Sequence, residues 1–186
     1  MPKKIVQNGD LVLRALAKVV PTAEIDSKKI KRVIADMKVA LSKEPDGVAI
    51  AAPQIGESLR IFVVAGRVFA LRTNEEDPEK IMDQRLYPDK AFINPQIIKR
   101  SKKERELLEG CLSVRHIYGK IKRSEKATVK AQDEDGKVFT QTGSGLLAEI
   151  FQHEIDHLDG ILFIDKAKEL RELHPEDEEG YNENNE

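Results

Sequence analysis

The sequence has little that would mark a membrane or secreted protein. No stretch approaches the run of about 18 apolar residues that a membrane-spanning helix needs. Residues 1–10 are basic but lack the apolar stretch of a secretory signal. There is one cysteine, Cys111, so a disulfide-stapled extracellular fold is not indicated. We therefore expect a cytoplasmic protein that binds neither a membrane nor DNA.

Basic residues are absent from the last part of the chain. Residues 172–186 carry seven acidic side chains and no lysine or arginine, and removing those seven charges from the net charge of −2 leaves the remainder at +5. A run of like charge is typical of a solvated, frayed segment. The rest of the 186-residue chain is long enough for one core. We expect a single domain over residues 1–166, followed by a charged, largely acidic and mobile tail over residues 167–186.

One stretch carries the clearest helical pattern. Residues 144–158 read SGLLAEIFQHEIDHL, and at helical spacing they separate into an apolar and a polar side. The apolar side consists of Leu146, Leu147, Ile150, Phe151, Ile155 and Leu158. The polar side consists of Glu149, Gln152, Asp156 and Asp159. His153, Glu154 and His157 fall inside the apolar arc, where each polar group needs a partner.

A metal ion would supply that partner. His153 and His157 are four residues apart, so both imidazoles leave a helix on the same side and can share one ion. Glu154 is rotated about 100° from His153, too far to join easily as a third ligand but close enough to act on a water at the ion. The alternative is a chance HExxH on a charged helix with solvated histidines. The surrounding apolar arc favours the metal site.

The other segments indicate a second helix and a series of strands, most of which precede the helix at residues 144–158. Residues 27–42 have a second helical pattern, and residues 73–90 form a polar insertion that we expect to be a mobile loop, with one helical turn near residues 81–86. The expected strands are residues 47–53, 60–65, 67–71, 91–99, 107–114, 117–123, 127–132, 138–142 and 161–165. This order predicts an α+β fold. Mainly antiparallel β-sheets would wrap around the central C-terminal helix, with the N-terminal helix packed on the outside.

An open metal site needs a third protein ligand. A metzincin-type peptidase has the pattern HExxHxxGxxH, which fits Gly160 but fails at Phe163. A thermolysin-type peptidase takes a later glutamate, for which Glu169 and Glu172 are candidates. Cys111 is the remaining candidate, although a lone cysteine is often an inert small hydrophobe.

Three motifs carry a family resemblance. GVAIAAPQ at residues 47–54, EGCLS at residues 109–113 and QHEIDH at residues 152–157 resemble the signature motifs of peptide deformylase, in the right order. Similarity extends over roughly residues 10–166. The resemblance implies that Cys111, His153 and His157 bind one divalent metal ion, most often Fe(II) in this family, with Zn(II), Ni(II) or Co(II) also possible.

The resemblance also implies a reaction. A water on the metal attacks the formyl carbonyl, with Glu154 as general base and then general acid. The Gln54 amide and the Leu112 backbone N–H donate to the carbonyl oxygen. The product is formate and a free amine at the N-terminal methionine of newly synthesised polypeptides. The remaining readings are an HExxH zinc peptidase and a non-catalytic, metal-stabilised binding domain.

The implied substrate is a nascent chain that begins with N-formylmethionine. Val48, Leu146 and Ile150 are expected to form the methionine pocket, and Gly47 and Ala49 to lie along the peptide. Ala49 replaces the usual glycine of the first motif, and Arg115 and His116 follow the second motif where the family often has proline. A transient ribosome contact is expected, but not through the acidic tail, because phosphates repel carboxylates.

Overall fold

The computed structural model describes residues 3–73 and 76–173. It has an α+β fold with two antiparallel sheets and a long helix near the C-terminus, α4 (Leu146–Leu158). The acidic segment that was expected to be mobile lies outside the described residues from position 174 onward. Within the two described ranges, no helix is long and apolar enough to cross a membrane.

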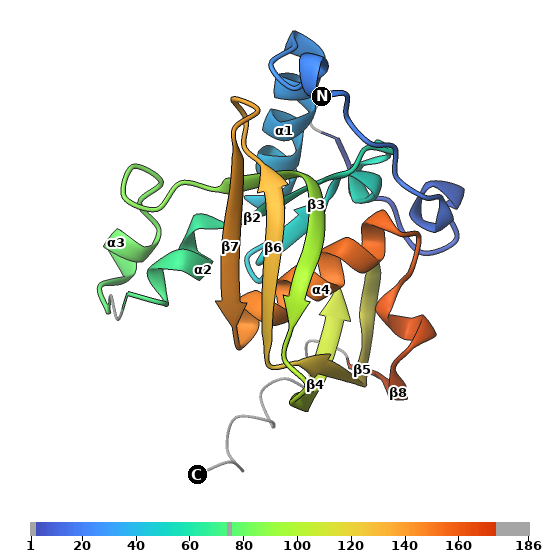
Figure 1. Ribbon diagram of the computed structural model, residues 1–186. Coiled ribbons are helices and arrows are strands. Elements are labelled where there is room, and N and C mark those ends of the chain that lie inside the picture. The colour runs from blue at the N-terminus through green and yellow to red at the C-terminus, as the bar shows by residue number, and fades with distance from the viewer. Residues whose placement is uncertain (1–2, 74–75, 174–186) are drawn as a thin grey trace.

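The larger sheet supports α4. Its strands, in spatial order, are β1 (Ala49–Ala51), β2 (Ile61–Val64), β3 (Lys90–Arg100), β6 (Lys126–Gln132) and β7 (Val138–Ser144). All neighbours pair antiparallel. One face of the sheet packs on α4, and the opposite face of β3, β6 and β7 is turned toward the viewer in Figure 1. The helix therefore lies inside the domain, as the sequence predicts.

The smaller sheet lies at the other side of α4. It consists of β4 (Glu104–Cys111), β5 (Val114–Ser124) and β8 (Lys168–Glu172), again with antiparallel neighbours. Strand β5 contacts α4, and β4 brings the only cysteine to the same helix. The two sheets thus hold α4 between them (Figure 1).

Helix α1 (Lys28–Leu41) covers β1 and β2 from outside, as expected. Ser27 caps it by accepting a hydrogen bond from the Ile30 N–H. Its buried face consists of Ile30, Val33, Ile34, Met37, Ala40 and Leu41. This face matches the predicted helical period.

Aromatic side chains join α4 to the larger sheet. The Phe62 and Phe92 rings stack with their centroids 4.6 Å apart. Phe151 of α4 meets Phe92 edge-on at 5.4 Å. Such pairs add about 0.5–1.5 kcal/mol beyond the area that they bury. The helix that carries the histidines is consequently fixed against the sheet by its opposite face.

Two expected strands are wrong, because short elements follow tertiary contacts. Instead of a strand at residues 67–71, the structure has the short helix α2 (Gly66–Ala70), in which buried and half-buried positions alternate and so mimic a strand. Residues 161–165 contain a 3₁₀ helix (Phe163–Asp165), where the Asp165 carboxylate accepts a hydrogen bond from the Leu162 N–H at 2.9 Å. The 3₁₀ helix is thus held by a bond within its own segment, whereas α2 depends on the distant Asp89, whose carboxylate accepts a hydrogen bond from the Gly66 N–H.

The C-terminal boundary also differs from the expectation. Residues 168–172 were assigned to a mobile tail, but they form β8, which pairs with Ile117, Tyr118 and Lys120 of β5. All five side chains of β8 are exposed, so its place depends on the backbone ladder. The sheet therefore continues past residue 166. In the polar insertion, the short helix α3 (Pro78–Ile81) begins earlier than expected, after the Asp77 cap.

Asn94 connects the N-terminal segment to β3. Its side chain accepts from the Val20 N–H and donates to the Val20 carbonyl, both at 2.8 Å, and also donates to Gln132 Oε1 at 3.0 Å. Its φ of 51° lies in the left-handed region, which asparagine tolerates better than most residues. One side chain therefore satisfies both polar groups of a distant residue.

We predict that Asn94→Ala lowers the free energy of unfolding by about 2–4 kcal/mol, because two backbone groups lose their partner and alanine is strained at this φ. Gln96→Ala, at an exposed position of the same strand, should change it by less than about 0.5 kcal/mol. Urea denaturation of both variants makes the comparison. Equal losses of unfolding free energy in the two variants would show that the Asn94 hydrogen bonds do not stabilise the fold.

Candidate metal centre and active site

Three potential ligands converge from two segments. Cys111 lies at the end of β4, and His153 and His157 lie one turn apart on α4. One ligand atom from each of the three lies within 4.8 Å of the others. Cys111 Sγ is 3.2 Å from His157 Nε2, and the two imidazole centroids are 4.9 Å apart. The geometry therefore brings together the three residues that the resemblance named.

The competing third ligands lie elsewhere. Glu169 and Glu172 belong to the exposed strand β8. Phe163 occupies the position where a metzincin-type peptidase has its third histidine, and its ring packs against His153 with centroids 6.3 Å apart. Cys111 is the residue that completes the group of potential ligands.

A glycine lets Cys111 approach the helix. A Cβ on Gly110 would lie 2.7 Å from the Tyr118 ring, closer than real Cβ atoms come. Directly after Gly110 the β4–β5 register shifts, so that Cys111 pairs with Val114 across a tight turn. The Ser113 N–H within this turn lies 3.4 Å from Cys111 Sγ. The turn thus directs the sulfur toward α4.

A buried ion-pair network orients His153. Its Nδ1 lies 3.1 Å from Glu109 Oε2. Arg123 of β5 binds both oxygens of Glu109, at 2.7 and 2.9 Å, and donates to Asp156 at 2.6 Å. A second partner on Nδ1 leaves Nε2 of the imidazole for a metal ion.

Glu109 is part of this site, although the sequence pattern alone assigned it no role. It lies two positions before Cys111 on the same strand, so the two side chains share one face of β4. That spacing is the signal that could have identified it. Arg123, at the far end of the neighbouring strand, carries no comparable signal.

The network sets the charges of the site. Burial alone would raise the pKa of Glu109, but hydrogen bonds from Arg123 and His153 lower it to about 2. Burial also opposes ionisation of Cys111, yet the charge on His157 and hydrogen bonds from both histidines hold the pKa of the thiol well below its ordinary value. The site therefore favours a thiolate, the form of cysteine that binds metals.

Glu154 lies beside the ligands without a fixed partner. It is buried, and among the described residues its Oε2 has no hydrogen-bond partner. Burial raises the pKa of Glu154 to about 6. A thiolate, two imidazoles and a free carboxylate oxygen form a donor set that fits a catalytic divalent ion and a proton acceptor beside it.

Gln54 faces the same point from the opposite wall. Its Oε1 accepts from the Ala51 N–H at 2.8 Å, which fixes the orientation of the amide. Its Nε2 donates to Ser113 Oγ at 3.2 Å and lies 3.6 Å from Cys111 Sγ. The amide N–H₂ is thereby directed at the site. Ser113, which the sequence pattern did not single out, completes this contact.

A cavity of about 510 Å³ opens onto these residues. The site residues named from sequence that line it are Gly47, Val48, Ala49, Gln54, Cys111, Leu112, Leu146, Ile150, His153 and Glu154. His157 is buried behind them. Leu146 was expected to be buried, but the residue is 41% exposed, because it is the first residue of α4.

Ala49, Arg115 and His116, the residues that depart from the family pattern, also line this cavity. Arg115 makes a paired salt bridge with Glu44, at 2.8 and 3.2 Å, which joins β5 to the segment after α1. His116 has a φ of 63°. Ala49 is buried within β1. All three therefore border the space where a ligand would bind.

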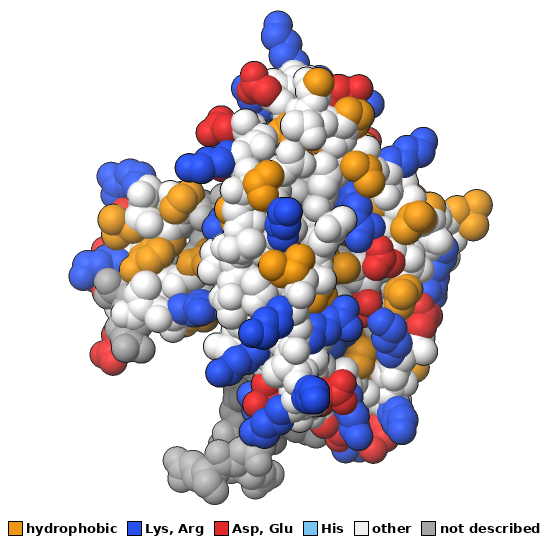
Figure 2. Space-filling view, in the orientation of Figure 1, with side chains coloured by type: hydrophobic (Ala, Val, Ile, Leu, Met, Phe, Trp, Pro, Cys, Tyr) orange, Lys and Arg blue, Asp and Glu red, His pale blue; other side chains and the backbone are white. Residues whose placement is uncertain are grey.

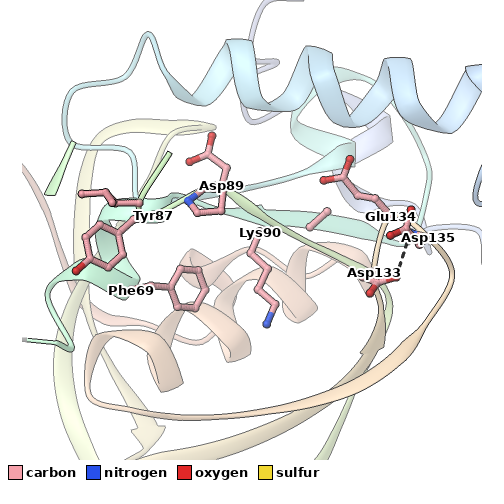
Figure 3. A pocket seen from close by; sticks show the side chains of 10 residues that line it. Phe69, Tyr87, Asp89, Lys90, Asp133, Glu134 and Asp135 are labelled. Carbon is pink, nitrogen blue, oxygen red and sulfur yellow. Dashed lines mark hydrogen bonds between the residues drawn. The ribbon is translucent and has the colours of Figure 1, made fainter. Parts of the chain in front are cut away.

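A second cavity, of about 410 Å³, lies away from the metal ligands, beside the polar insertion and the β6–β7 turn (Figure 3). Lys90 points into it between Phe69 and residues 133–135. Its ammonium lies 4.3 Å from the centroid of the Phe139 ring and donates to Gln141 Oε1 at 3.0 Å. Burial lowers the pKa of Lys90. This cavity holds none of the residues named for catalysis.

A family model described as polypeptide deformylase matches residues 2–173. The chain belongs to the peptide deformylase family. Peptide deformylase 2 of Clostridium acetobutylicum is 40% identical over 167 residues, which cover 90% of this chain and 96% of the relative. The peptide deformylase of Dictyoglomus turgidum is 42% identical over 91% of this chain and 95% of its own length.

Solved deformylase structures share the fold. The Thermotoga maritima peptide deformylase has a TM-score of 0.74 and 33% identity, covering 90% of this chain and 99% of that one. An Acinetobacter baumannii peptide deformylase, solved with Met-Ala-Ser bound, has a TM-score of 0.72 and 30% identity, covering 87% and 96%. The family consists of metal-dependent enzymes, and these relatives are deformylases rather than peptidases. The peptidase and non-catalytic readings therefore receive no support.

We predict that the Glu109 network makes this deformylase acid-sensitive. A pKa lowered from 4.5 to about 2 means that ionised Glu109 stabilises the fold above about pH 4.5, and that this contribution disappears as the pH falls toward 2. Between about pH 5 and pH 2.5, the wild type should lose about 2–3 kcal/mol more unfolding free energy than Glu109→Gln.

Chemical denaturation at several pH values, with metal removed by a chelator, measures this difference. Glu104→Gln, at an exposed position of the same strand, is the matched control and should follow the wild type. Parallel pH curves for wild type and Glu109→Gln would contradict the prediction.

Proposed function

We propose that this chain removes the formyl group from N-formylmethionine at the start of newly synthesised polypeptides and releases formate. The observation that carries the proposal is the convergence of Cys111, His153 and His157 at the wall of a cavity of about 510 Å³, beside a buried Glu154 oxygen that has no hydrogen-bond partner in the described part of the chain. A metal-dependent hydrolase that acts on a peptide amide needs this combination of an ion-binding group, a proton acceptor and room for a peptide.

In this proposal Cys111, His153 and His157 hold one divalent ion, Fe(II) in the cell, with Zn(II), Ni(II) or Co(II) able to replace it. Two imidazoles and a thiolate suit all four ions. When bound, the ion supplies Lewis acidity that polarises the formyl group and acidifies water. A thiolate ligand must stay reduced, which agrees with the proposed cytoplasmic location.

Glu154 moves the proton. Its carboxylate accepts a proton from the water whose oxygen bonds to the formyl carbon. It then returns that proton to the methionine nitrogen as the C–N bond breaks, so that formate and a free amine leave. A pKa near 6 suits both steps at neutral pH. The surrounding apolar arc of α4 keeps bulk water from competing for the carboxylate.

Gln54 and Leu112 stabilise the developing negative charge on the carbonyl oxygen. The Gln54 amide is held by the Ala51 N–H, so it need not reorient during the reaction. The backbone N–H of Leu112 directly follows the cysteine and is the second donor. Each such donor commonly contributes about 2.7–4 kcal/mol to transition-state stabilisation.

The cavity wall fits a methionine-first peptide. Val48, Leu146 and Ile150 offer apolar surface for the methionine side chain, and Gly47 and Ala49 lie along the path of the backbone. Binding of Met-Ala-Ser by the Acinetobacter baumannii relative supports this assignment, because that peptide has the form of a deformylated product.

We predict that Glu154→Gln lowers kcat/KM for formyl-Met-Ala-Ser by about 10²–10⁴-fold, because the amide cannot accept a proton. Formate release should be measured with protein purified without air and reloaded with Fe(II) or Ni(II), and the metal content should stay near one ion per chain. Glu104→Gln should retain wild-type activity. Normal formate release by Glu154→Gln would overturn its assigned role, and cleavage of unformylated peptides would favour a peptidase.

The proposed ribosome contact has a candidate surface on the outer face of the larger sheet. Lys99, Lys126 and Lys130 are exposed on this face, around Thr128, which pairs with Lys99. None of them is ion-paired within residues 3–73 and 76–173. Figure 2 shows lysine and arginine side chains gathered over the lower half of this face. A surface of this kind attracts the phosphate backbone of RNA.

We predict that the double variant Lys126→Glu, Lys130→Glu co-sediments more weakly with ribosomes. The negative slope of log K for ribosome binding against log salt concentration should become shallower by about two, because two phosphate contacts are lost. Lys28→Glu with Lys43→Glu makes the same change in net charge on α1 and just after it, and should leave binding near the wild-type value. Equal binding by both double variants would exclude this face as the contact.

A further inference from the structure

Glu149 is a carboxylate in the substrate cavity that the proposed reaction does not use. Its helical spacing places it on the polar side of α4, with Gln152 and Asp156. The structure separates these residues. Gln152 bonds the backbone of Ser124, and Asp156 bonds Arg123, so both serve the contact with β5.

Glu149 points into the cavity beside Leu146 and Ile150, one turn before His153. No hydrogen bond or ion pair to its carboxylate is present within the described ranges of the chain. Burial, followed by the nearby charge of Glu109, raises the pKa of Glu149 to about 7. A partly buried carboxylate without a partner gains the most from a ligand that brings a positive charge.

The other charges around the cavity leave an acidic excess. Arg115 is already paired with Glu44. Asp46 is exposed at the rim and makes no ion pair in the part of the chain that the structure describes. Apart from the catalytic group, Glu149 and Asp46 therefore present uncompensated negative charge to a bound peptide.

The position of Glu149 limits which part of a peptide it can meet. Four residues of α-helix separate it from His153, about 6 Å along the axis. Two residues of extended peptide span about 6.6 Å. A group that pairs with Glu149 therefore belongs to a residue close to the formylated methionine.

We propose that Glu149, assisted by Asp46, selects formylated peptides with lysine or arginine at one of the two positions after formylmethionine, and disfavours aspartate and glutamate there. The proposal rests on the deformylase function above and assigns its substrate class. Glu149 acts by pairing with a cationic side chain, and bond breaking remains with Glu154.

The test compares kcat/KM for four peptides at about pH 8, where Glu149 is ionised: formyl-Met-Lys-Ser, formyl-Met-Ala-Lys, formyl-Met-Glu-Ser and formyl-Met-Ala-Glu. For the wild type, the better lysine peptide should exceed its glutamate counterpart on the order of tenfold, mainly through KM. The ratio should fall when the ionic strength is raised from about 0.05 M to about 0.5 M, because salt screens the partly exposed pair.

Variants assign the effect to the residue. Glu149→Gln should bring the lysine-to-glutamate ratio within about threefold, and adding Asp46→Asn should remove the remainder. Glu149→Asp, which keeps the charge, should keep most of the preference. Glu104→Gln, six residues before Gly110 on β4 and outside the cavity lining, should leave the ratio unchanged.

The failures are distinguishable. Equal kcat/KM for lysine and glutamate peptides, or a preference that survives in the Glu149→Gln, Asp46→Asn double variant, overturns the selection by charge and leaves the deformylase function standing. Absence of formate from every peptide with metal-loaded wild type overturns the function itself. The salt dependence of the wild-type ratio tests the proposal even if Glu149→Gln fails to fold.

Discussion

The buried pair of Glu109 and Arg123 holds the active site together, because it ties α4, which carries His153 and His157, to the β4–β5 hairpin, which carries Cys111. Arg123 belongs to β5, Glu109 to β4, and their partners His153 and Asp156 to α4. A buried ion pair of this kind adds little to stability unless its hydrogen bonds are complete. Here each charge has more than one partner, so the cost of desolvation is offset and the geometry is fixed. The same contacts fix the position of α4 relative to the strands and the orientation of the His153 ring. The imidazole is therefore oriented by the same interactions that pack the helix.

The centre of the fold could be predicted because strong local signals coincide there. The apolar arc of residues 144–158 predicts a buried helix, and the structure has one at Leu146–Leu158. The Asp-Gly pair at positions 135–136 predicts the hairpin between β6 and β7, and Gly136 adopts the positive φ of 78° that the turn needs. The third candidate ligand, Cys111, could not be predicted from a local pattern. Spacing on the helix says nothing about which distant strand approaches it, so Cys111 rested on its resemblance to a known motif.

What could not be predicted depends on long-range contacts. Strand β8 is fully exposed and highly charged, and only the β5 backbone reveals it as a strand. The short helix at Gly66–Ala70 depends on Asp89, whose carboxylate accepts from the Gly66 N–H at 2.9 Å. A Cβ at Gly66 would collide with the Tyr87 carbonyl, so this helix exists only with the end of the polar insertion packed on it. In each case the deciding partner lies 20 residues or more along the chain.

Charged groups divide between those that build the domain and those that face the cavity. Asp156, Arg123 and Glu109 satisfy one another, and Arg115 and Glu44 do the same at the rim. Glu154 and Glu149 have no ion-pair partner among the described residues, and burial raises the pKa of both. Buried carboxylates without an ion-pair partner cost stability, so their presence on one cavity wall indicates a role toward what enters the cavity. Both lie on α4, four residues or fewer from His153, so one helix carries the proposed proton acceptor and the carboxylate proposed to meet a substrate side chain.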